Sequence, residues 1–437
     1  DPARAFLAVQ RYRLDDFAPY IFRTDDYGTT WTSLTNGKNG IPADHFVRVV
    51  REDPERRGLL YAGTEFGIYV SFDDGANWRS LQLDLPVTPI TDLAVKRGDL
   101  VVATQGRSSW ILDDLSVVHQ LTPEIEAAEL HLFRPRPVVR WVDGQGSSGR
   151  GPVGKNPPFG ALIHYLLPDG LDDEDADEVT LEILDAGGEV LRSLSSQEPE
   201  PQAPNLWRKF LSDSVEPPLL DARAGPNREV SNPRLADAGL VADAVLWGTA
   251  AGPVVPPGTY RARLTVGDLS DTVSFEVVAD PRLTVSQEDM EARYELSRSI
   301  WHELTRSHDA VALCRRVRTQ VSETADRAGD EDLAEEAEAL ISKLTAIEDR
   351  LHQSRAQSSQ DVLNFPSKLD NQLVFLLEVV ESAPGRPTEA STARFAELET
   401  ELGGILAELD DLLDNDVSAF EAMLKDRGAT HIIVDEL

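Results

Sequence analysis

The first 140 positions alternate short apolar runs with turn residues, which is typical of a chain of short β-strands. Three pairs of runs have the length and spacing of antiparallel strands. These pairs are Phe6–Val9 with Tyr20–Phe22, Leu59–Ala62 with Ile68–Val70, and Leu100–Thr104 with Trp110–Leu112. This part of the chain is therefore predicted to be all β.

An octapeptide follows the first two pairs and shows that the chain repeats. Residues 24–31 and 71–78 share the scheme Ser/Thr-x-Asp-x-Gly-x-Thr/Asn-Trp, and their final tryptophans lie 47 positions apart. A degenerate third copy ends in Asp113, nine positions after Thr104. A four-strand unit that recurs about every 40–47 residues marks a β-propeller blade. Residues 1–140 are thus predicted to form about three blades of a partial β-propeller.

Three blades cannot close a ring, since closed propellers have about four to eight. We therefore expect an unpaired edge and an uncovered apolar face around Phe6, Tyr20 and Phe22. The remaining blades would come from upstream sequence or from another chain. In that ring Trp31 and Trp78 would lie between blades.

The middle of the chain begins with a break in the pattern. Residues 141–158 are rich in Gly, Ser and Pro and are predicted to be a linker or a long loop. Two hairpins are predicted after it, one turning at residues 185–188 and one at Gly267-Asp268. The alternating strands favour an immunoglobulin-like β-sandwich over residues 159–281.

From residue 282 to 437 the apolar period is that of a helix. Ser286, with Asp289 three positions later, resembles a capping box. Two seams keep 4-3 spacing: Leu333, Ala337, Leu340, Leu344, Ile347 and Leu351, and then Phe395, Leu398, Leu402, Ile405, Leu409 and Leu412. Such seams pack helices together, so an antiparallel bundle of three or four helices is predicted. A strand-like run at residues 430–434 closes this multidomain chain, which is β first and α afterwards.

Charge excludes several classes of partner. The 437 residues include 42 Lys+Arg and 76 Asp+Glu, which gives a formal net charge of −34. A surface this acidic argues against binding nucleic acid or an anionic membrane, and no apolar run is long enough to span a bilayer. The one cysteine, Cys314, forms no internal disulfide and is expected to be buried in a helix.

The basic residues are themselves skewed, with seven Lys against 35 Arg. Few Lys and many Asp and Glu suit a protein that stays solvated in concentrated salt, where self-repulsion is screened. The alternative is an acidic proteome encoded by a GC-rich genome. Both interpretations remain open.

The two octapeptides resemble the Asp-box, or BNR repeat, of sialidases, xyloglucanases and sortilin-type receptors. The wider sequence resembles the C-terminal part of large secreted bacterial proteins described as BNR-repeat glycosyl hydrolase-like or sortilin-like. Six runs carry that likeness: residues 65–71, 86–93, 106–114, 154–160, 256–260 and 363–366. The resemblance implies a secreted, periplasmic or cell-surface protein. Residues 199–250 fit it poorly.

The motif residues themselves are predicted to be structural. Their hydroxyl and carboxylate oxygens would accept hydrogen bonds from backbone N–H groups in a tight turn, and the tryptophan would pack in the core. These residues are Thr24, Asp26, Gly28 and Trp31 in the first copy, and Ser71, Asp73, Gly75 and Trp78 in the second. A ligand or metal site is the less favoured alternative.

Candidate binding residues lie in loops that could reach the mouth of a propeller. They are Glu65 and Arg107, with Trp110 as a stacking surface and Asp44 as a further carboxylate. No spacing joins them into a catalytic constellation, and Arg107 could instead bond carbonyls of a neighbouring blade. We therefore assign no catalytic residue.

Other clusters favour plainer interpretations. The acidic run at residues 172–178 lacks the spacing of a calcium loop, and Asp410, Asp411 and Asp414 are expected on the wet face of a helix. His302 and His308 are not spaced as a metal pair, and no nucleotide or hydrolase fingerprint occurs. The sequence thus predicts no metal and no cofactor.

Two functions from different classes remain. The first is a non-catalytic binding protein, acting outside the cytoplasm on polysaccharide or polypeptide. The second is a glycoside hydrolase, sialidase- or xyloglucanase-like, whose active centre lies mostly in blades absent from this chain. The first is favoured because no acid/base pair can be assembled from these residues.

The composition generates a prediction about salt. If the acidity is an adaptation to salt, the melting temperature should rise from low to molar NaCl as repulsion among carboxylates is screened. Thermal unfolding followed by circular dichroism over that range measures the effect. A melting temperature that stays flat would remove the halophilic interpretation.

Overall fold

The computed structural model describes residues 1–141, 158–171, 177–197, 219–358 and 360–427. The chain consists mostly of β-sheets followed by a C-terminal helical region, as the sequence predicts. It divides into two compact units. The first unit holds residues 1–136 with strands β13 and β16, and the second holds the other sheet and the helices.

Three small antiparallel sheets follow one another in the first unit. Sheet 1 contains β1 (Ala5–Arg11), β2 (Asp16–Thr24) and β3 (Thr32–Ser33). Sheet 2 contains β4 (Val47–Glu52), β5 (Leu60–Thr64), β6 (Ile68–Ser71) and β7 (Arg79–Ser80). Sheet 3 contains β8 (Ile90–Lys96), β9 (Asp99–Thr104) and β10 (Ser109–Leu112). The three predicted strand pairs are confirmed as β1–β2, β5–β6 and β9–β10.

Shorter elements complete this unit. The 3-10 turn η1 (Tyr12–Leu14) joins β1 to β2, and helices α1 (Ser116–Gln120) and α2 (Pro123–Glu126) follow sheet 3. A further sheet has the order β11 (His131–Leu132), β13 (Ala161–Leu167) and β16 (Gly225–Ser231).

The backbone shows which strands are equivalent in the three repeats. Tyr27, Asp74 and Asp114 all have φ near +60° at the same place in the motif. From that turn a backbone N–H reaches a residue one or two positions ahead of β1, β5 or β9. These bonds join Tyr27 N to Ala3 O (3.1 Å), Asp74 N to Gly58 O (2.9 Å) and, from the residue after Asp114, Leu115 N to Gly98 O (2.7 Å). Therefore β1, β5 and β9 are equivalent strands of the three repeats. Sheet 2 has an additional strand, β4, paired with β5, whereas sheet 1 has no strand at the corresponding edge of β1.

Sheet 2 is buried on both faces. Towards sheet 1 its residues Val50, Leu60 and Ala62 join a core with Ile21 and Leu34. Towards sheet 3 its residues Leu59, Tyr61 and Val70 join a second core, which includes Ile90, Leu93 and Leu100. This explains why every residue of β5 is buried, although a strand with one wet face would alternate.

The two motif tryptophans differ in burial. Trp78 is 4% exposed, and its indole N–H donates to the Leu34 carbonyl at 3.1 Å. Gly40 allows this packing, because a Cβ there would lie 1.8 Å from the Trp78 oxygen. Trp31 departs from the expected packing: it is 45% exposed, since none of the described segments lies over it as Leu34 lies over Trp78.

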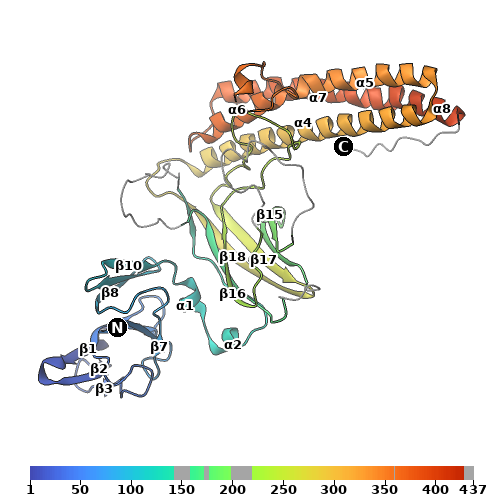
Figure 1. The fold of residues 1–437 in the computed structure, drawn as a ribbon. Coiled ribbons are helices and arrows are strands. Elements are labelled where there is room, and N and C mark those ends of the chain that lie inside the picture. Colours follow the sequence, from blue (N-terminus) through green and yellow to red (C-terminus); the bar gives the residue numbers. More distant parts are fainter. Residues whose placement is uncertain (142–157, 172–176, 198–218, 359, 428–437) are drawn as a thin grey trace. The chain divides into compact units, whose positions relative to one another are not determined.

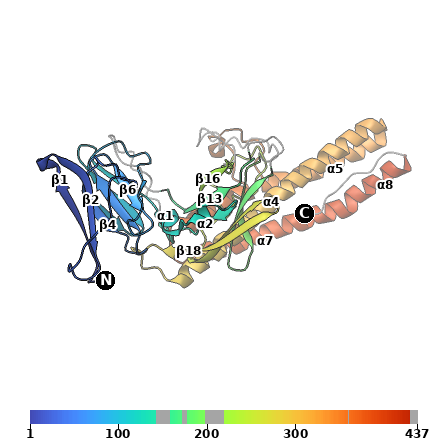
Figure 2. The ribbon, with the colours of Figure 1, turned by 90° about the horizontal axis from the view of Figure 1, so that it is seen from below.

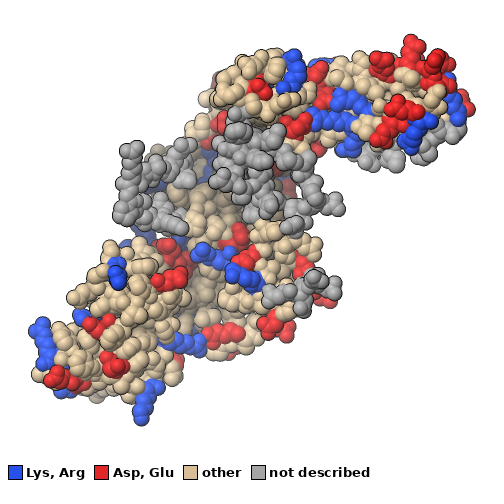
Figure 3. Space-filling view, in the orientation of Figure 1, with Lys and Arg blue, Asp and Glu red and all other residues tan. Residues whose placement is uncertain are grey.

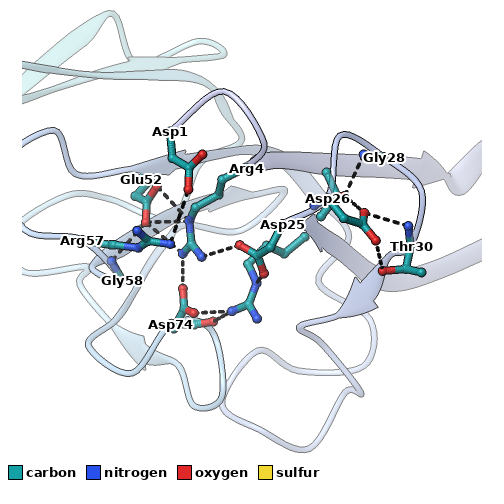
Figure 4. A network of polar contacts seen from close by, with 12 residues as sticks. Asp1, Arg4, Asp25, Asp26, Gly28, Thr30, Glu52, Arg57, Gly58 and Asp74 are labelled. Carbon is teal, nitrogen blue, oxygen red and sulfur yellow. Dashed lines mark hydrogen bonds and ion pairs between the residues drawn. The ribbon is translucent and has the colours of Figure 1, made fainter.

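Ion pairs fasten sheet 1 to sheet 2 at the end of the strands that carries the motif turns (Figure 4). The Arg4 guanidinium is 5% exposed and pairs with Glu52 (2.9 Å), Asp25 (2.9 Å) and Asp74. Arg23 pairs with Asp25 and with Asp74. Two cations from sheet 1 therefore converge on Asp74, which belongs to the motif turn of sheet 2.

The second unit contains a five-stranded sheet of order β12-β18-β17-β14-β15. Its strands are β12 (Val138–Arg140), β14 (Val179–Leu184), β15 (Val190–Ser195), β17 (Gly258–Val266) and β18 (Leu269–Ala279). Both predicted hairpins are confirmed, as β14–β15 and as β17–β18. Only β12 runs parallel to its neighbour, β18.

The helices of this unit are α4 (Gln287–Ala328), α5 (Glu331–Leu351), α6 (Leu369–Glu381), α7 (Glu389–Leu412) and α8 (Ser418–Asp426). A 3-10 turn, η2 (Asp361–Leu363), lies ahead of α6, and a π turn, η3 (Leu413–Val417), joins α7 to α8. Ser286 caps α4 through the Asp289 N–H, as predicted.

The helices α4, α5 and α7 run side by side (Figures 1 and 2). The pairs Arg350–Glu408 and Lys343–Asp416 make α5 antiparallel to α7. Arg315 and Arg318 both reach Glu348, which places α5 along the second half of α4. Ser297 bonds Glu381 and His308 approaches Asp370, which places α6 antiparallel to the first half. The predicted antiparallel packing is thus confirmed, and every residue of both seams is buried.

Acidic side chains gather at one end of the helical region (Figure 3). Glu331, Asp332, Glu335 and Glu336 at the start of α5 and Asp426 at the end of α8 are all exposed there. Asp410, Asp411 and Asp414 are exposed too, as expected. The predicted linker core at 142–157, the acidic residues 172–176 and the strand-like run 430–434 lie outside the described residues.

The seams generate a prediction about stability. Leu344 and Leu402 are fully buried, so replacing either by Ala should lower the free energy of unfolding by about 2–5 kcal/mol. Glu338→Ala and Glu401→Ala are matched controls on the exposed faces of α5 and α7, and should change it by less than about 0.5 kcal/mol. Urea unfolding measures all four, and equal effects in seam and control would contradict this packing.

The ion pairs generate a second prediction. Arg4→Ala should destabilise the first unit by about 1–3 kcal/mol, because three carboxylates lose a buried cation that they share while remaining partly in contact with water. Arg57→Ala is the control, since Arg57 is 69% exposed and lies 3.7 Å from Asp1. It should cost no more than about 0.5 kcal/mol. Limited proteolysis between sheets 1 and 2, with thermal unfolding, distinguishes the two variants.

Candidate functional site

Loops gather at the end of the N-terminal sheets that is opposite to the motif turns. We call this the loop end and define it by residues 12–17, 44–48, 65–67 and 105–110. The Glu65 N–H donates to the Phe46 carbonyl, and the Gln105 N–H donates to the Pro89 carbonyl. At its edge, the end of β5 packs on the start of β8 so closely that a Cβ at Gly63 would meet Ile90 at 2.6 Å.

Aromatic rings form a cluster where sheets 1 and 2 meet at this end. Phe46 is buried and stacks on Tyr12, with ring centroids 4.9 Å apart. Phe17 packs at 6.3 Å on the same ring and keeps about half of its surface exposed. The Arg48 guanidinium lies over Phe46 at 5.2 Å from the ring centroid. A buried ring thus fixes both an exposed ring and a cation.

Arg48 holds the predicted residue Glu65. Its Nε donates to Glu65 Oε2 at 2.7 Å, and its terminal nitrogen reaches the same oxygen at 2.5 Å. Oε1 of Glu65 takes no hydrogen bond from any described residue. The carboxylate is therefore oriented by Arg48, with one oxygen left as an acceptor for a ligand.

Phe66, beside Glu65, is 43% exposed and is supported from below by His45, whose ring centroid lies 4.6 Å away. Tyr69 hydrogen-bonds His45 Nδ1 at 2.9 Å. Burial, and then the charge of Asp44, raise the pKa of the Tyr69 hydroxyl, so this hydroxyl keeps its proton. Asp44 is mostly exposed, 4.0 Å from His45 Nε2.

Arg107, on the β9–β10 loop, lies beside Trp110 in β10. The Trp110 indole donates to the Arg107 carbonyl at 2.9 Å, and the Arg107 N–H donates to Thr104 Oγ1 at 3.2 Å. The Trp110 side chain is 38% exposed. The Arg107 guanidinium is exposed and bonds none of the described carbonyls, so the alternative role in blade contacts has no support here. No hydrogen bond or ion pair joins Glu65 to either residue within the described ranges.

The motif residues lie in the turns at the opposite end and form two equal sets of hydrogen bonds. Thr24 Oγ1 accepts from the Gly28 N–H (2.8 Å) and donates to Asp26, which accepts from the Thr30 N–H (2.8 Å). In the second copy Ser71 Oγ accepts from the Gly75 N–H (2.9 Å) and donates to Asp73. The carboxylates of Asp26 and Asp73 are thus used up within their own turns.

Gly75 has a specific reason to be glycine. Its φ of +89° is in the left-handed region, and a Cβ would lie 2.7 Å from Leu34 of sheet 1. The motif turn of sheet 2 is therefore in close contact with the preceding repeat.

The remaining candidates, one cysteine and two histidines, lie in α4, which belongs to the second unit. Cys314 is fully buried, as expected, and burial raises the pKa of its thiol to about 12. His302 is exposed and His308 is buried. The described residues contain no group of three or more His, Cys, Asp or Glu able to hold a metal ion. Among the helices described, none is long and apolar enough to cross a membrane.

Several residues of the loop end escape analysis of the sequence alone. They are Tyr12, Phe17, His45, Phe46, Arg48 and Phe66. The repeat offers one signal: Glu65 and Arg107 follow β5 and β9, and Tyr12 follows the equivalent strand β1. Aligning the first repeat with the other two therefore identifies the loop that follows β1, which contains Tyr12 and Phe17, as the equivalent of the loops with Glu65 and Arg107.

Comparisons with known proteins add little. No family model matches the chain, and no curated protein matches it. The structure of an ancestral GH74 enzyme is similar, with TM-score 0.20 and 13% identity over 46% of this chain and 27% of that one. The extracellular domain of a putative hybrid two-component system from B. thetaiotaomicron is similar as well, with TM-score 0.19 and 8% identity over 61% and 29%. The chain thus spans less than a third of either protein, and likeness at these TM-scores carries no argument about its function.

Proposed function

We propose that the chain is a non-catalytic binding protein that takes a polysaccharide chain at the loop end. The observation that supports this most directly is the set of three exposed rings, Phe17, Phe66 and Trp110, each fixed by a neighbour. A planar ring packs well against the apolar face of a sugar, and it loses little conformational entropy on binding because it is already held. Glu65 Oε1 and the Arg107 guanidinium provide an acceptor and donors beside those rings.

The net charge of the protein favours an uncharged polysaccharide as the ligand. The net charge of −34 repels a polyanion over the whole molecule, although Arg48 and Arg107 lie at the site. We therefore propose a neutral polysaccharide, met outside the cytoplasm. A polypeptide remains the alternative ligand.

We further propose that sheets 1, 2 and 3 are blades of an Asp-box β-propeller. The equivalent left-handed turns and the two-sided burial of sheet 2 support this. The outward face of sheet 1 would then receive a further blade, since Leu7 and Trp31 are exposed and Tyr20 and Phe22 are half-buried on it. Phe6, which the sequence analysis expected on this face, packs instead against the core between sheets 1 and 2, because its side chain points to the other face of β1. That blade would come from upstream sequence or from another chain.

For the five-stranded sheet we propose an immunoglobulin-like module. The Tyr260 hydroxyl donates to the Pro256 carbonyl, four residues upstream, at 2.8 Å. This bond resembles the tyrosine corner of such sandwiches.

A glycoside hydrolase completed by further blades is the competing function. It requires one carboxyl group to donate a proton and a second to act opposite to it. Glu65 is oriented by an ion pair, and Asp44 is open to water. Both carboxylates are therefore better suited to accept hydrogen bonds from a ligand than to act as an acid/base pair. For this reason we prefer the binding function to the hydrolase.

Ring removal tests the proposal. Phe66→Ala and Trp110→Ala should each weaken binding of a soluble neutral polysaccharide such as xyloglucan about tenfold, because a lost ring contact costs about 1–2 kcal/mol. Tyr27→Ala is the matched control, because Tyr27 is an exposed ring at the opposite end. Isothermal titration of a panel of neutral polysaccharides against the full chain measures these affinities.

The outcomes separate the alternatives. Equal binding by all three variants, or binding of polypeptides alone, would contradict the proposal. Release of chromophore from a panel of chromogenic glycosides, lost in Glu65→Gln, would instead favour the hydrolase.

A further inference from the structure

In the second unit, the segment Val241–Trp247 lies along the helices, and we call it the strap. The Val241 N–H donates to His308 Nδ1 on α4 at 3.1 Å. At the other end the Trp247 N–H donates to Asn371 Oδ1 on α6 at 3.0 Å, and Asn371 Nδ2 donates back to the Trp247 carbonyl at 3.1 Å. Between them Ala244 and Leu246 are buried in the helical core. The strap is thus held by two polar ends and an apolar middle.

The two polar ends are connected through a buried carboxylate. Asp370 is fully buried at the start of α6, and its Oδ1 accepts the Asn371 N–H at 2.6 Å. Its Oδ2 lies 2.7 Å from His352 Nδ1 and 3.6 Å from His308 Nε2. Nε2 of His308 is buried and makes no hydrogen bond to a described residue.

These contacts determine the state of the His308 ring. A nitrogen that accepts a hydrogen bond carries no proton, so Nδ1 is bare and the ring hydrogen is on Nε2. A second proton could go only to Nδ1. It would turn the acceptor of the Val241 N–H into a donor, so that two N–H groups would face each other in a buried place.

We propose that His308 is an acid-sensitive latch: protonation of its ring releases the strap Val241–Trp247 from helices α4 and α6. The groups that face the ring are Asp370 of α6 and Asp243 of the strap, which attract the proton, and His352 after α5 and Arg315 of α4, which oppose it. Burial has the largest influence, because a charged imidazolium loses its hydration there.

The direction of the pH effect follows from that burial, which lowers the pKa of His308 from 6.5 to about 4. The latched state therefore favours the neutral ring, and a released ring titrates near its ordinary value. The latch is complete above about pH 6.5 and weakens as the pH falls towards 4. In that interval the equilibrium constant for release rises about tenfold for each pH unit.

Release has a consequence for the surface. Trp247 is half-exposed and lines an apolar groove with Phe375 and Val379 of α6 and with Thr388 at the start of α7. Trp247 forms one wall of that groove. The groove is therefore complete at neutral pH, and it loses this wall when acid releases the strap.

Hydrogen exchange of the full chain tests the latch. Between pH 7.5 and 4.5, after correction for the intrinsic exchange rate, peptides that cover the strap should lose protection about tenfold for each unit below pH 6.5. Peptides from the seams of α5 and α7 should stay protected. In His308→Asn the side-chain oxygen replaces Nδ1 as the acceptor and does not titrate, so the strap should stay protected throughout. His302→Asn is the matched control, an exposed histidine of the same helix, and should behave as the parent.

Three results would overturn the proposal: strap protection that is flat with pH in the parent chain, an acid transition that persists in His308→Asn, or seams that open together with the strap. If His308→Asn is unstable, NMR titration of the His308 ring in the parent chain replaces it. The ring must gain its proton in step with strap release, and a ring that stays neutral while the strap opens also refutes the latch.

Discussion

A sheet of three or four short strands cannot bury two apolar faces by itself, and the first unit depends on this constraint. Sheet 2 has an apolar face on each side, so it is stable only between sheets 1 and 3, each of which supplies half of one core. Stability of this kind accumulates along the series, as in repeat proteins, where each unit contacts only its neighbours. The same stacking orders the loop end, because Phe46 is held between Tyr12 next to sheet 1 and Arg48 of sheet 2.

The contact between sheets 1 and 2 is specific as well as apolar. Trp78 fits under residues 34–40 because Gly40 has no side chain to block it, and its indole satisfies the Leu34 carbonyl. At the strand ends Arg4 brings charges from both sheets together in a nearly buried place. An apolar face allows sliding, whereas these directional bonds fix one register. Trp31, at the equivalent position of the first repeat, has no such neighbour among the described residues and is exposed.

How much the sequence predicts depends on whether a signal is local. The motif turns, the hairpins β14–β15 and β17–β18, the cap at Ser286 and both helical seams are set by residues within a few positions, and the sequence reveals them. Glu65 and Arg107 lie in loops as predicted, yet the partners of Glu65 were missed, because Arg48 and Phe46 approach it only through the pairing of β4 with β5. Strands β13 and β16 lie between residues of the second unit in sequence and still pair in the first unit. The strap has no period at all, since its order comes from His308 and Asn371, each more than 60 positions away.

The motif aspartate has different hydrogen-bond partners in the three repeats, and its pKa changes with them. The pKa of Asp26 is lowered by the backbone and side-chain hydrogen bonds of Thr30 and Thr24. Burial works against Asp73, but hydrogen bonds from Asn77 and Ser71 outweigh it and the pKa of Asp73 is lowered too. In the third repeat Ile111 and Val117 replace those polar partners. The pKa of Asp113 is consequently raised, by burial first and then by the nearby charge of Asp99. The pKa of the same position is therefore shifted in opposite directions in successive repeats, although the left-handed turn is common to all three. Backbone and side-chain hydrogen bonds lower it in the first two copies, whereas burial and the charge of Asp99 raise it in the third.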